Sequence, residues 1–121
     1  MTVRMLLLAA LFAAATTPVL AHHGWGGNEE KITELTGTVV KPVSLAGPHA
    51  TMQVKVGNVV WDITLAPPPR TSAAGLRENS IPMGATVTVR GNRSLEADHH
   101  EMKVVLVVHN GKRYAVYPDR L

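Results

Sequence analysis

The chain contains no cysteine and few aromatic residues. Without cysteine there is no disulfide, no thiolate nucleophile and no thiolate metal ligand, so stability depends on core packing. Any metal site must use histidine, methionine, carboxylate or backbone atoms. One Phe, two Tyr and two Trp leave few rings on which bases could stack. The formal net charge of +3 is too small to indicate nucleic acid by electrostatics alone, so we expect no nucleic-acid ligand.

Common enzyme signatures are also missing. The sequence has no HExxH, no GxSxG, no P-loop and no GxGxxG motif, which excludes the usual zinc-protease, hydrolase and nucleotide-binding patterns. Its serine, histidine and aspartate residues have no spacing that pairs them as a catalytic set. The sequence therefore predicts a protein that is not an enzyme.

A long apolar run lies at the start of the chain. Arg4 precedes the uncharged segment 5–15, and Pro18 and the small residue Ala21 follow it. This order is typical of a secretory signal peptide. Because a membrane span needs about 20 apolar residues, an uncleaved anchor is the less favoured alternative. We expect cleavage after Ala21, or else after Leu20, and a periplasmic or secreted protein with no stable membrane insertion.

The remaining sequence predicts an all-β domain. Period-two alternation or a continuous apolar run is typical of strands, and such segments are found at 32–40, 51–56, 59–65, 85–90 and 103–108. Asn110-Gly111 is a strong hairpin signal. The prolines at 67–69 exclude a strand there, and Thr71 or Ser72 is expected to cap a short helix through Arg77.

Three strands, a short helix and two or three further strands suit a small OB-like barrel of five to six strands. An open β-sandwich is the alternative. The predicted organisation is a signal peptide at 1–21, a His/Gly arm at 22–31 and a single barrel domain at 32–121.

Two adjacent histidines, His22 and His23, follow the expected cleavage point. If cleavage follows Ala21, the α-amine and ring of His22 can chelate one ion, and another imidazole completes a three-nitrogen histidine brace. The amine pKa of about 7.7–8.0 lets a metal displace its proton at neutral pH. If cleavage follows Leu20, His23 stands third and suits a square-planar site. Copper fits both nitrogen sets because it heads the divalent affinity order.

His49, after Gly47-Pro48, is the candidate third ligand for this site. The alternative is a structural histidine whose ring is satisfied by a backbone carbonyl, with His22 and His23 merely solvated. Trp25 is expected to anchor the arm on the barrel, because a glycine-rich start would otherwise fray.

A candidate second site precedes the segment 103–108. It comprises His99, His100 and Met102, with His100 and Met102 on one strand face. Imidazole and thioether together suit Cu(I). The alternative is an exposed polar loop, and His109 is expected to be a solvated turn residue.

Several short motifs resemble one protein family. They are Ala-His-His-Gly-Trp at 21–25, LTGTV at 35–39, Gly-Pro-His-Ala at 47–50, WDITL at 61–65 and GATVTVRG at 84–91. The sequence resembles a family of small exported bacterial proteins of unknown function with an OB-like barrel. That family has Ser where this chain has Gly24, and Asn where it has Gly47. The resemblance implies pairing His22 or His23 with His49, whereas the pair at 99–100 departs from the family pattern.

These observations predict a periplasmic copper-binding or copper-handling protein. A non-catalytic OB-type module that binds a small ligand or an envelope protein, with incidental histidines, is the alternative. An oxidative copper enzyme built on the N-terminal brace is a weaker option, because the chain has few aromatic residues to form a substrate face.

Overall fold

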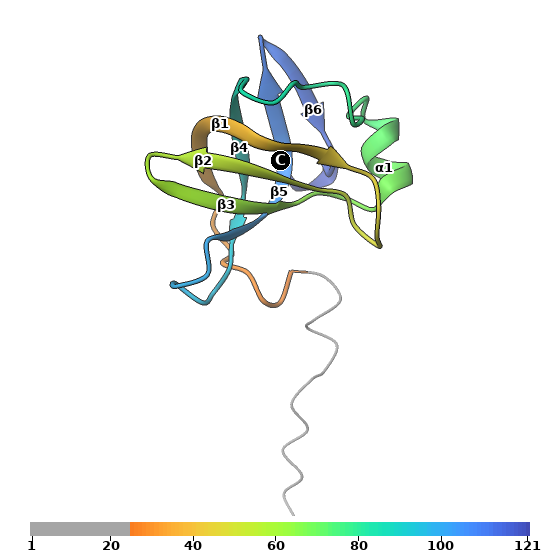
Figure 1. Ribbon diagram of the computed structural model, residues 1–121. Helices are drawn as coiled ribbons and strands as arrows, with labels where there is room; N and C mark the ends of the chain where they lie inside the picture. The colour runs from red at the N-terminus through yellow and green to blue at the C-terminus, as the bar shows by residue number, and fades with distance from the viewer. Residues whose placement is uncertain (1–24) are drawn as a thin grey trace, which may run out of the picture.

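The computed structural model describes residues 25–121 (Figure 1). Within this part of the chain, strands alternate with short turns, and one short α-helix interrupts them. The elements are β1 Thr33–Ser44, β2 Thr51–Val56, β3 Val59–Thr64, α1 Pro68–Ala73, β4 Thr86–Arg93, β5 Glu101–His109, β6 Lys112–Ala115 and the 3-10 helix η2 Pro118–Arg120.

Five strands close into a barrel. β1 pairs antiparallel with both β2 and β4, β2 pairs with β3, and β4 pairs with β5. A parallel pairing of β3 with β5 closes the ring, and α1 connects β3 to β4 (Figure 1). The all-β, OB-like prediction is confirmed, and the closed barrel rules out the open sandwich. β6 adds a further strand to β5.

The barrel core comes from the inward positions of the alternating strands. Val39, Val54, Ile63, Val89 and Val104 are among its buried side chains. Four consecutive residues of β5, from Val104 to Val107, are buried, as their continuous apolar sequence predicts. The turn after it has positive φ at Asn110 and at Gly111, which is the geometry that an Asn-Gly hairpin requires.

β1 extends further than the predicted segment 32–40. Pro42 argues against a continuing strand, but the pairing with β2 shifts register between Val39 and Lys41 and again between Lys41 and Ser44. Such irregularities tolerate proline and bend a strand. The first half of β1 thus pairs with β4 and the second half with β2, which carries β1 around the barrel.

The predicted helix cap is wrong. α1 begins at Pro68, with Pro67 at the N-cap position and no side-chain cap. Proline suits the first helical position because its missing N–H would have no intrahelical partner there. Thr71 lies inside the helix, where its buried hydroxyl donates to the Ala66 carbonyl oxygen at 2.8 Å. Ser72 is likewise helical.

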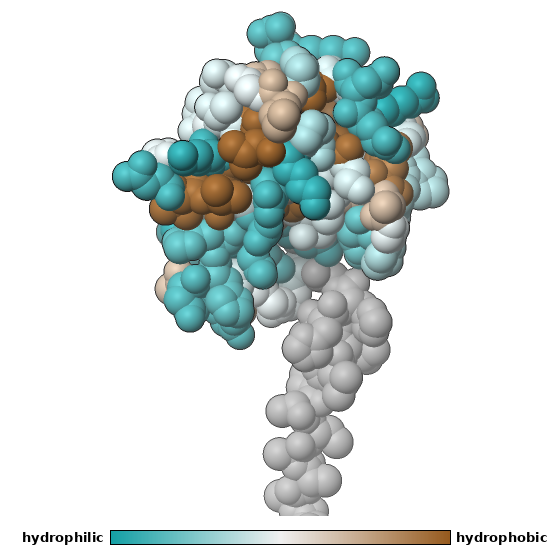
Figure 2. Space-filling view, viewed as in Figure 1, coloured by the Kyte–Doolittle hydropathy of each residue, from teal (hydrophilic) through white to brown (hydrophobic). Residues whose placement is uncertain are grey.

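The surface is largely polar on the face that Figure 2 presents. Brown hydrophobic areas there are divided by teal hydrophilic ones. The exposed large hydrophobic residues of the described chain are Ile32, Val60, Met83, Leu95 and Leu121. Among residues 25–121, no helix is long and apolar enough to cross a membrane.

Candidate functional site

The described end of the arm is hydrogen-bonded to the barrel. Glu29 donates its backbone N–H to the Arg93 carbonyl at 2.8 Å, and Leu95 donates to the Gly27 carbonyl at 3.0 Å. Asn28 forms an isolated bridge with Ser94. These bonds run alongside the end of β4 and the start of the β4–β5 loop, so residues 27–29 follow a defined path.

The buried side chain of Asn92 binds the next residues of the arm, 29–31. Its side chain is only 4% exposed, and its Nδ2 donates to the carbonyl oxygens of Glu29, Glu30 and Lys31 at 2.9–3.3 Å. In return Asn28 donates its Nδ2 to the Asn92 carbonyl at 2.9 Å. A buried amide with this many contacts fixes local geometry, because loss of a partner would leave polar groups unsatisfied.

Trp25 packs against the C-terminal segment. Its ring meets Tyr117 edge to face, with centroids 5.0 Å apart and an interplanar angle of 75°. Two cations lie over the same indole ring: Lys103 Nζ is 4.3 Å from its centroid and Arg120 Cζ is 3.9 Å from it. We call Trp25, Lys103, Tyr117 and Arg120 the arm cluster. It joins the arm, β5 and η2, which are far apart in sequence.

A third cation borders the arm cluster. Arg70 of α1 places its Cζ 4.9 Å from the Tyr117 ring centroid and its Nη2 3.2 Å from Asp119 Oδ1. Tyr117 is 7% exposed, and burial raises the pKa of its phenol despite the opposing positive charges of Arg70 and Arg120. The phenol therefore remains protonated at neutral pH.

His49 lies in the β1–β2 loop, beside the same cluster. It follows Gly47, whose φ of +83° produces a turn that glycine adopts most easily. Burial lowers the pKa of His49, and the positive charge of Lys103 lowers it further. The ring is therefore unprotonated at neutral pH. It has no hydrogen-bond partner among residues 25–121, so the expected structural alternative, a bond to a backbone carbonyl, has no support there.

Of the other predicted primary ligands, His22 and His23 lie outside the described residues. Trp25, the predicted anchor of the arm, follows His23 by two positions. Lys103, which lies over the Trp25 ring, is also the residue whose positive charge helps to lower the pKa of His49.

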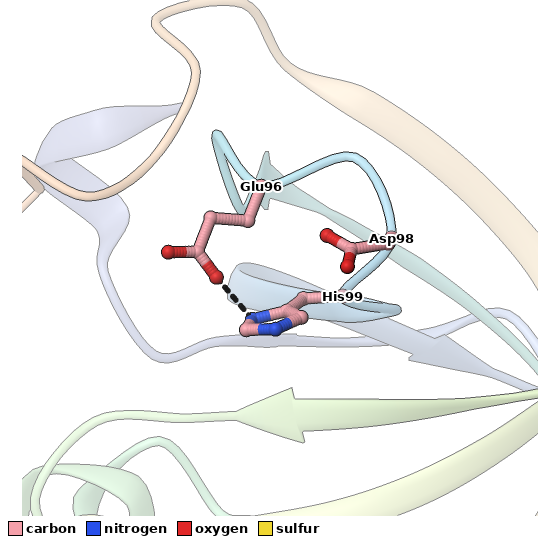
Figure 3. A group of neighbouring side chains, drawn as sticks. All are labelled: Glu96, Asp98 and His99. Carbon is pink, nitrogen blue, oxygen red and sulfur yellow. Dashed lines mark ion pairs between the residues drawn. The ribbon is translucent and has the colours of Figure 1, made fainter.

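The β4–β5 loop has a different chemistry (Figure 3). His99 Nδ1 lies 2.6 Å from Glu96 Oε2, and Asp98 is beside them. Their potential ligand atoms all lie within 4.8 Å of one another, and all three residues are exposed. The sequence analysis did not predict Glu96 and Asp98 as ligands, although both lie in the same short stretch, EADHH, as the histidines. The ion pair between residues i and i+3 accounts for this arrangement without a metal.

The predicted ligands of the second site, His99, His100 and Met102, differ in their exposure to solvent. Met102 is 1% exposed and belongs to the core, whereas His99 and His100 are exposed. The His100 ring instead packs edge to face on Trp61, with centroids 5.3 Å apart. Arg93 Cζ lies 4.9 Å from the same Trp61 ring.

His109 has a structural partner. Its Nδ1 lies 3.2 Å from the Thr86 carbonyl oxygen, which connects the end of β5 to the start of β4. The expectation of a merely solvated turn residue is therefore incomplete.

A groove of about 310 Å³ is lined by residues of β1, β2, β3 and the start of β5. Its polar lining includes Lys41, Gln53, Asp62 and Glu101. Gln53 donates its Nε2 to Asp62 Oδ1 at 2.8 Å. Both signs of charge are present, so this groove suits a small polar ligand rather than an apolar one.

Comparison with known proteins gives no matching family model and no matching curated protein. The residues and their geometry therefore carry the functional argument.

Proposed function

We propose that this protein is exported and binds copper at its mature N-terminus, with His22 and His23 as N-terminal ligands and His49 as the third nitrogen donor. The environment of His49 carries the proposal. Its ring is unprotonated at neutral pH and has no hydrogen-bond partner within residues 25–121. A neutral imidazole with an available lone pair is the form that binds copper.

The position of the arm supports the same ligand set. Trp25 contacts Lys103, and the charge of Lys103 acts on His49. His23 precedes Trp25 by only two residues, and two residues of extended chain span at most about 7 Å. An arm held at Trp25 can therefore present its terminal histidines to the end of the barrel where His49 lies.

Lys103 has two opposite effects on this site. Its positive charge adds to the effect of burial in lowering the pKa of His49, which favours coordination, but it also repels any cation that binds nearby. Copper binding is therefore weaker than the ligands alone would give. A single substitution at Lys103 would therefore alter both the pKa of His49 and the repulsion of copper.

The direct test is a copper titration of the processed protein, after its N-terminal residue has been determined. We expect one Cu(II) equivalent with a nitrogen-rich EPR spectrum. His49→Ala should weaken binding at least tenfold, or about 1.4 kcal/mol. The matched control His99→Ala, which alters the exposed loop, should leave affinity unchanged. If the mature chain begins at His22, unchanged affinity in both His22→Ala and His49→Ala would exclude the site.

The cleavage position changes the expected spectrum. If His22 is the first residue, three nitrogens bind and His49 contributes one of them. If Ala21 is the first residue, the amine, two backbone amides and the His23 ring form a square-planar site. In that case His23→Ala should reduce affinity more than His49→Ala, and EPR hyperfine splitting should indicate four nitrogens.

A second candidate function is supported by the groove on β2 and β3. Here the protein is a non-catalytic OB-type module, and a small polar ligand contacts Gln53, Asp62 and Glu101. The test is a screen of small polar solutes by NMR, with shifts mapped on the backbone. Shifts confined to β2 and β3 that vanish in Asp62→Ala would favour this function. Copper-induced shifts near His49 would favour the first.

A further inference from the structure

One line of polar side chains crosses four neighbouring strands of the barrel. Lys41 of β1 is the register partner of Gln53 of β2, which in turn pairs with Asp62 of β3. Asp62 pairs with Glu101 at the start of β5. All four residues line the groove of about 310 Å³, a volume at the lower end of the range for small-molecule sites. We call these four residues the polar row.

The two ends of the polar row carry opposite charges. Lys41 supplies an ammonium at one end, and Asp62 and Glu101 supply two carboxylates at the other. Gln53 lies between them, and its Nε2 donates to Asp62 Oδ1 at 2.8 Å. Because neighbouring strands are about 4.8 Å apart, the backbones of Lys41 and Asp62 are separated by about 10 Å across the sheet. The groove therefore has a positive end and a negative end.

The charged groups of the polar row have no ion-pair partner in the described part of the chain. Within residues 25–121, the ion pairs involve neither Lys41 nor Asp62 nor Glu101. All three residues are exposed, so a ligand can reach them from solvent. The two carboxylates lie on neighbouring strands and repel each other. A cationic group bound beside both of them would reduce this repulsion.

The opposite charges restrict the chemistry of a ligand. Lys41 would repel the second ammonium of a diamine, and the two carboxylates would repel a purely anionic ligand. An uncharged solute would leave all the charged groups without an ion-pair partner. A ligand with an ammonium at one end and a carboxylate at the other matches both ends. Because an extended chain spans about 3.3–3.6 Å per residue, about three residues of peptide place these two groups roughly 10 Å apart.

We propose that the groove binds a short zwitterionic peptide of about three residues, with its ammonium at Asp62 and Glu101 and its carboxylate at Lys41. Gln53 lies midway along the polar row, where its side-chain oxygen is an acceptor for a peptide N–H. This inference rests on the second candidate function, in which the groove takes a small polar ligand. It does not depend on copper, because no residue of the polar row belongs to the proposed copper site.

The test uses the processed protein with a chelator present, so that copper does not affect the result. Trialanine is titrated, and the backbone amide resonances are followed by NMR. We expect saturable shifts confined to β1, β2, β3 and the start of β5. N-acetyl-trialanine lacks the ammonium and trialanine amide lacks the carboxylate, so each loses a charge-assisted contact and should bind about tenfold more weakly. Equal binding of trialanine and both capped peptides, or tighter binding of the diamine cadaverine, would overturn the proposal.

Variants that remove one charge assign the two ends of the peptide. In Lys41→Gln the partner of the carboxylate is gone, so trialanine should bind about tenfold more weakly, as weakly as its amide does. Glu101→Gln should likewise reduce the difference between trialanine and its acetylated form. The matched controls Lys112→Gln and Glu78→Gln remove the same charges from exposed residues outside the groove and should bind as the wild type does.

Thermal unfolding checks that each variant folds. Equal losses of affinity in the groove variants and in their controls would contradict the assignment. If trialanine causes no shift but an uncharged solute such as sucrose shifts β2 and β3, the groove binds a polar ligand and the peptide assignment is wrong. If neither solute shifts these strands, the peptide assignment and the groove function both fail, whereas copper binding is judged separately by His49→Ala.

Discussion

The arm cluster with its neighbour His49 and the β4–β5 loop both bring histidine together with charged groups, but they do so differently. His49 and the arm cluster join the arm, the β1–β2 loop, β5 and η2, and their charges are mainly positive. The loop is local: Glu96 and His99 are three residues apart, exposed, and paired with each other at 2.6 Å. The surroundings of a histidine, rather than the number of histidines, therefore determine which one can act as a ligand.

The largest expected effect comes from removing the aromatic contact of the arm. Trp25→Ala should lower the free energy of unfolding by about 2–4 kcal/mol, because the partly buried indole loses its apolar contacts. Urea unfolding followed by circular dichroism measures this loss. In the loop, the control Leu95→Ala removes a side chain that is 61% exposed and should change stability by less than about 0.5 kcal/mol. If Trp25→Ala and Leu95→Ala lowered the free energy of unfolding equally, the arm cluster would contribute no more to stability than the β4–β5 loop.

Acid should weaken the folded state through His49. Its pKa is lowered in the folded protein, so below the unfolded value of about 6.5 the unfolded chain binds more protons. The His49 contribution is therefore fully present at neutral pH and is lost as pH falls through that value toward the folded pKa. The free energy of unfolding of the wild type, minus that of His49→Gln, should therefore decrease as the pH falls from about 7.5 to 5.5. A constant difference would contradict the pKa direction.

Lys103→Met should raise the pKa of His49, as measured by NMR titration of its ring. The rise should be partial, because burial is the larger cause of the lowered value and remains in the variant. Lys112→Met is the matched control: Lys112 lies 5.1 Å from the Tyr114 ring centroid, in another cation–π contact. If both variants raise the pKa of His49 equally, the overall positive charge of the protein lowers that pKa, rather than the charge of Lys103 in the arm cluster.

The smallest effect is expected in the loop. Glu96→Gln removes the ion pair with His99, whose side chains are 65% and 48% exposed. Solvent screens such a pair, so the free energy of unfolding should change by no more than about 0.5 kcal/mol. Chemical denaturation measures it. A loss comparable with that of Trp25→Ala would show that the loop is structurally as important as the arm cluster.

The strands were predictable from sequence because one face of each is buried. Met52, Val54 and Ile63 alternate with polar residues and lie in the core, and a shift of one residue would have reversed their faces. Two boundaries were not predictable. β1 continues past Pro42 because the barrel bends there, and α1 starts at Pro68, where proline replaces a side-chain cap.

The candidate site was only partly predictable. His49 and Trp25 stood out in sequence through their motifs, whereas Lys103, Tyr117 and Arg120 had no such mark. They belong to a strand and a C-terminal turn of ordinary composition. Glu96 and Asp98 were not predicted, because exposed carboxylates beside histidine are common and only the folded chain brings their oxygen atoms close to the His99 ring.

By itself, the sequence determined the strand pattern, the Asn-Gly turn and the chemistry available without cysteine. These are local properties: alternation, turn geometry and composition act over a few residues. The tertiary structure alone decided that Trp25, Lys103 and Arg120 meet beside His49. Barrel closure through β3 and β5, and the bonds that hold the arm along β4, bring these residues together. Contacts between such distant segments arise from packing of the whole chain, so local patterns do not encode them.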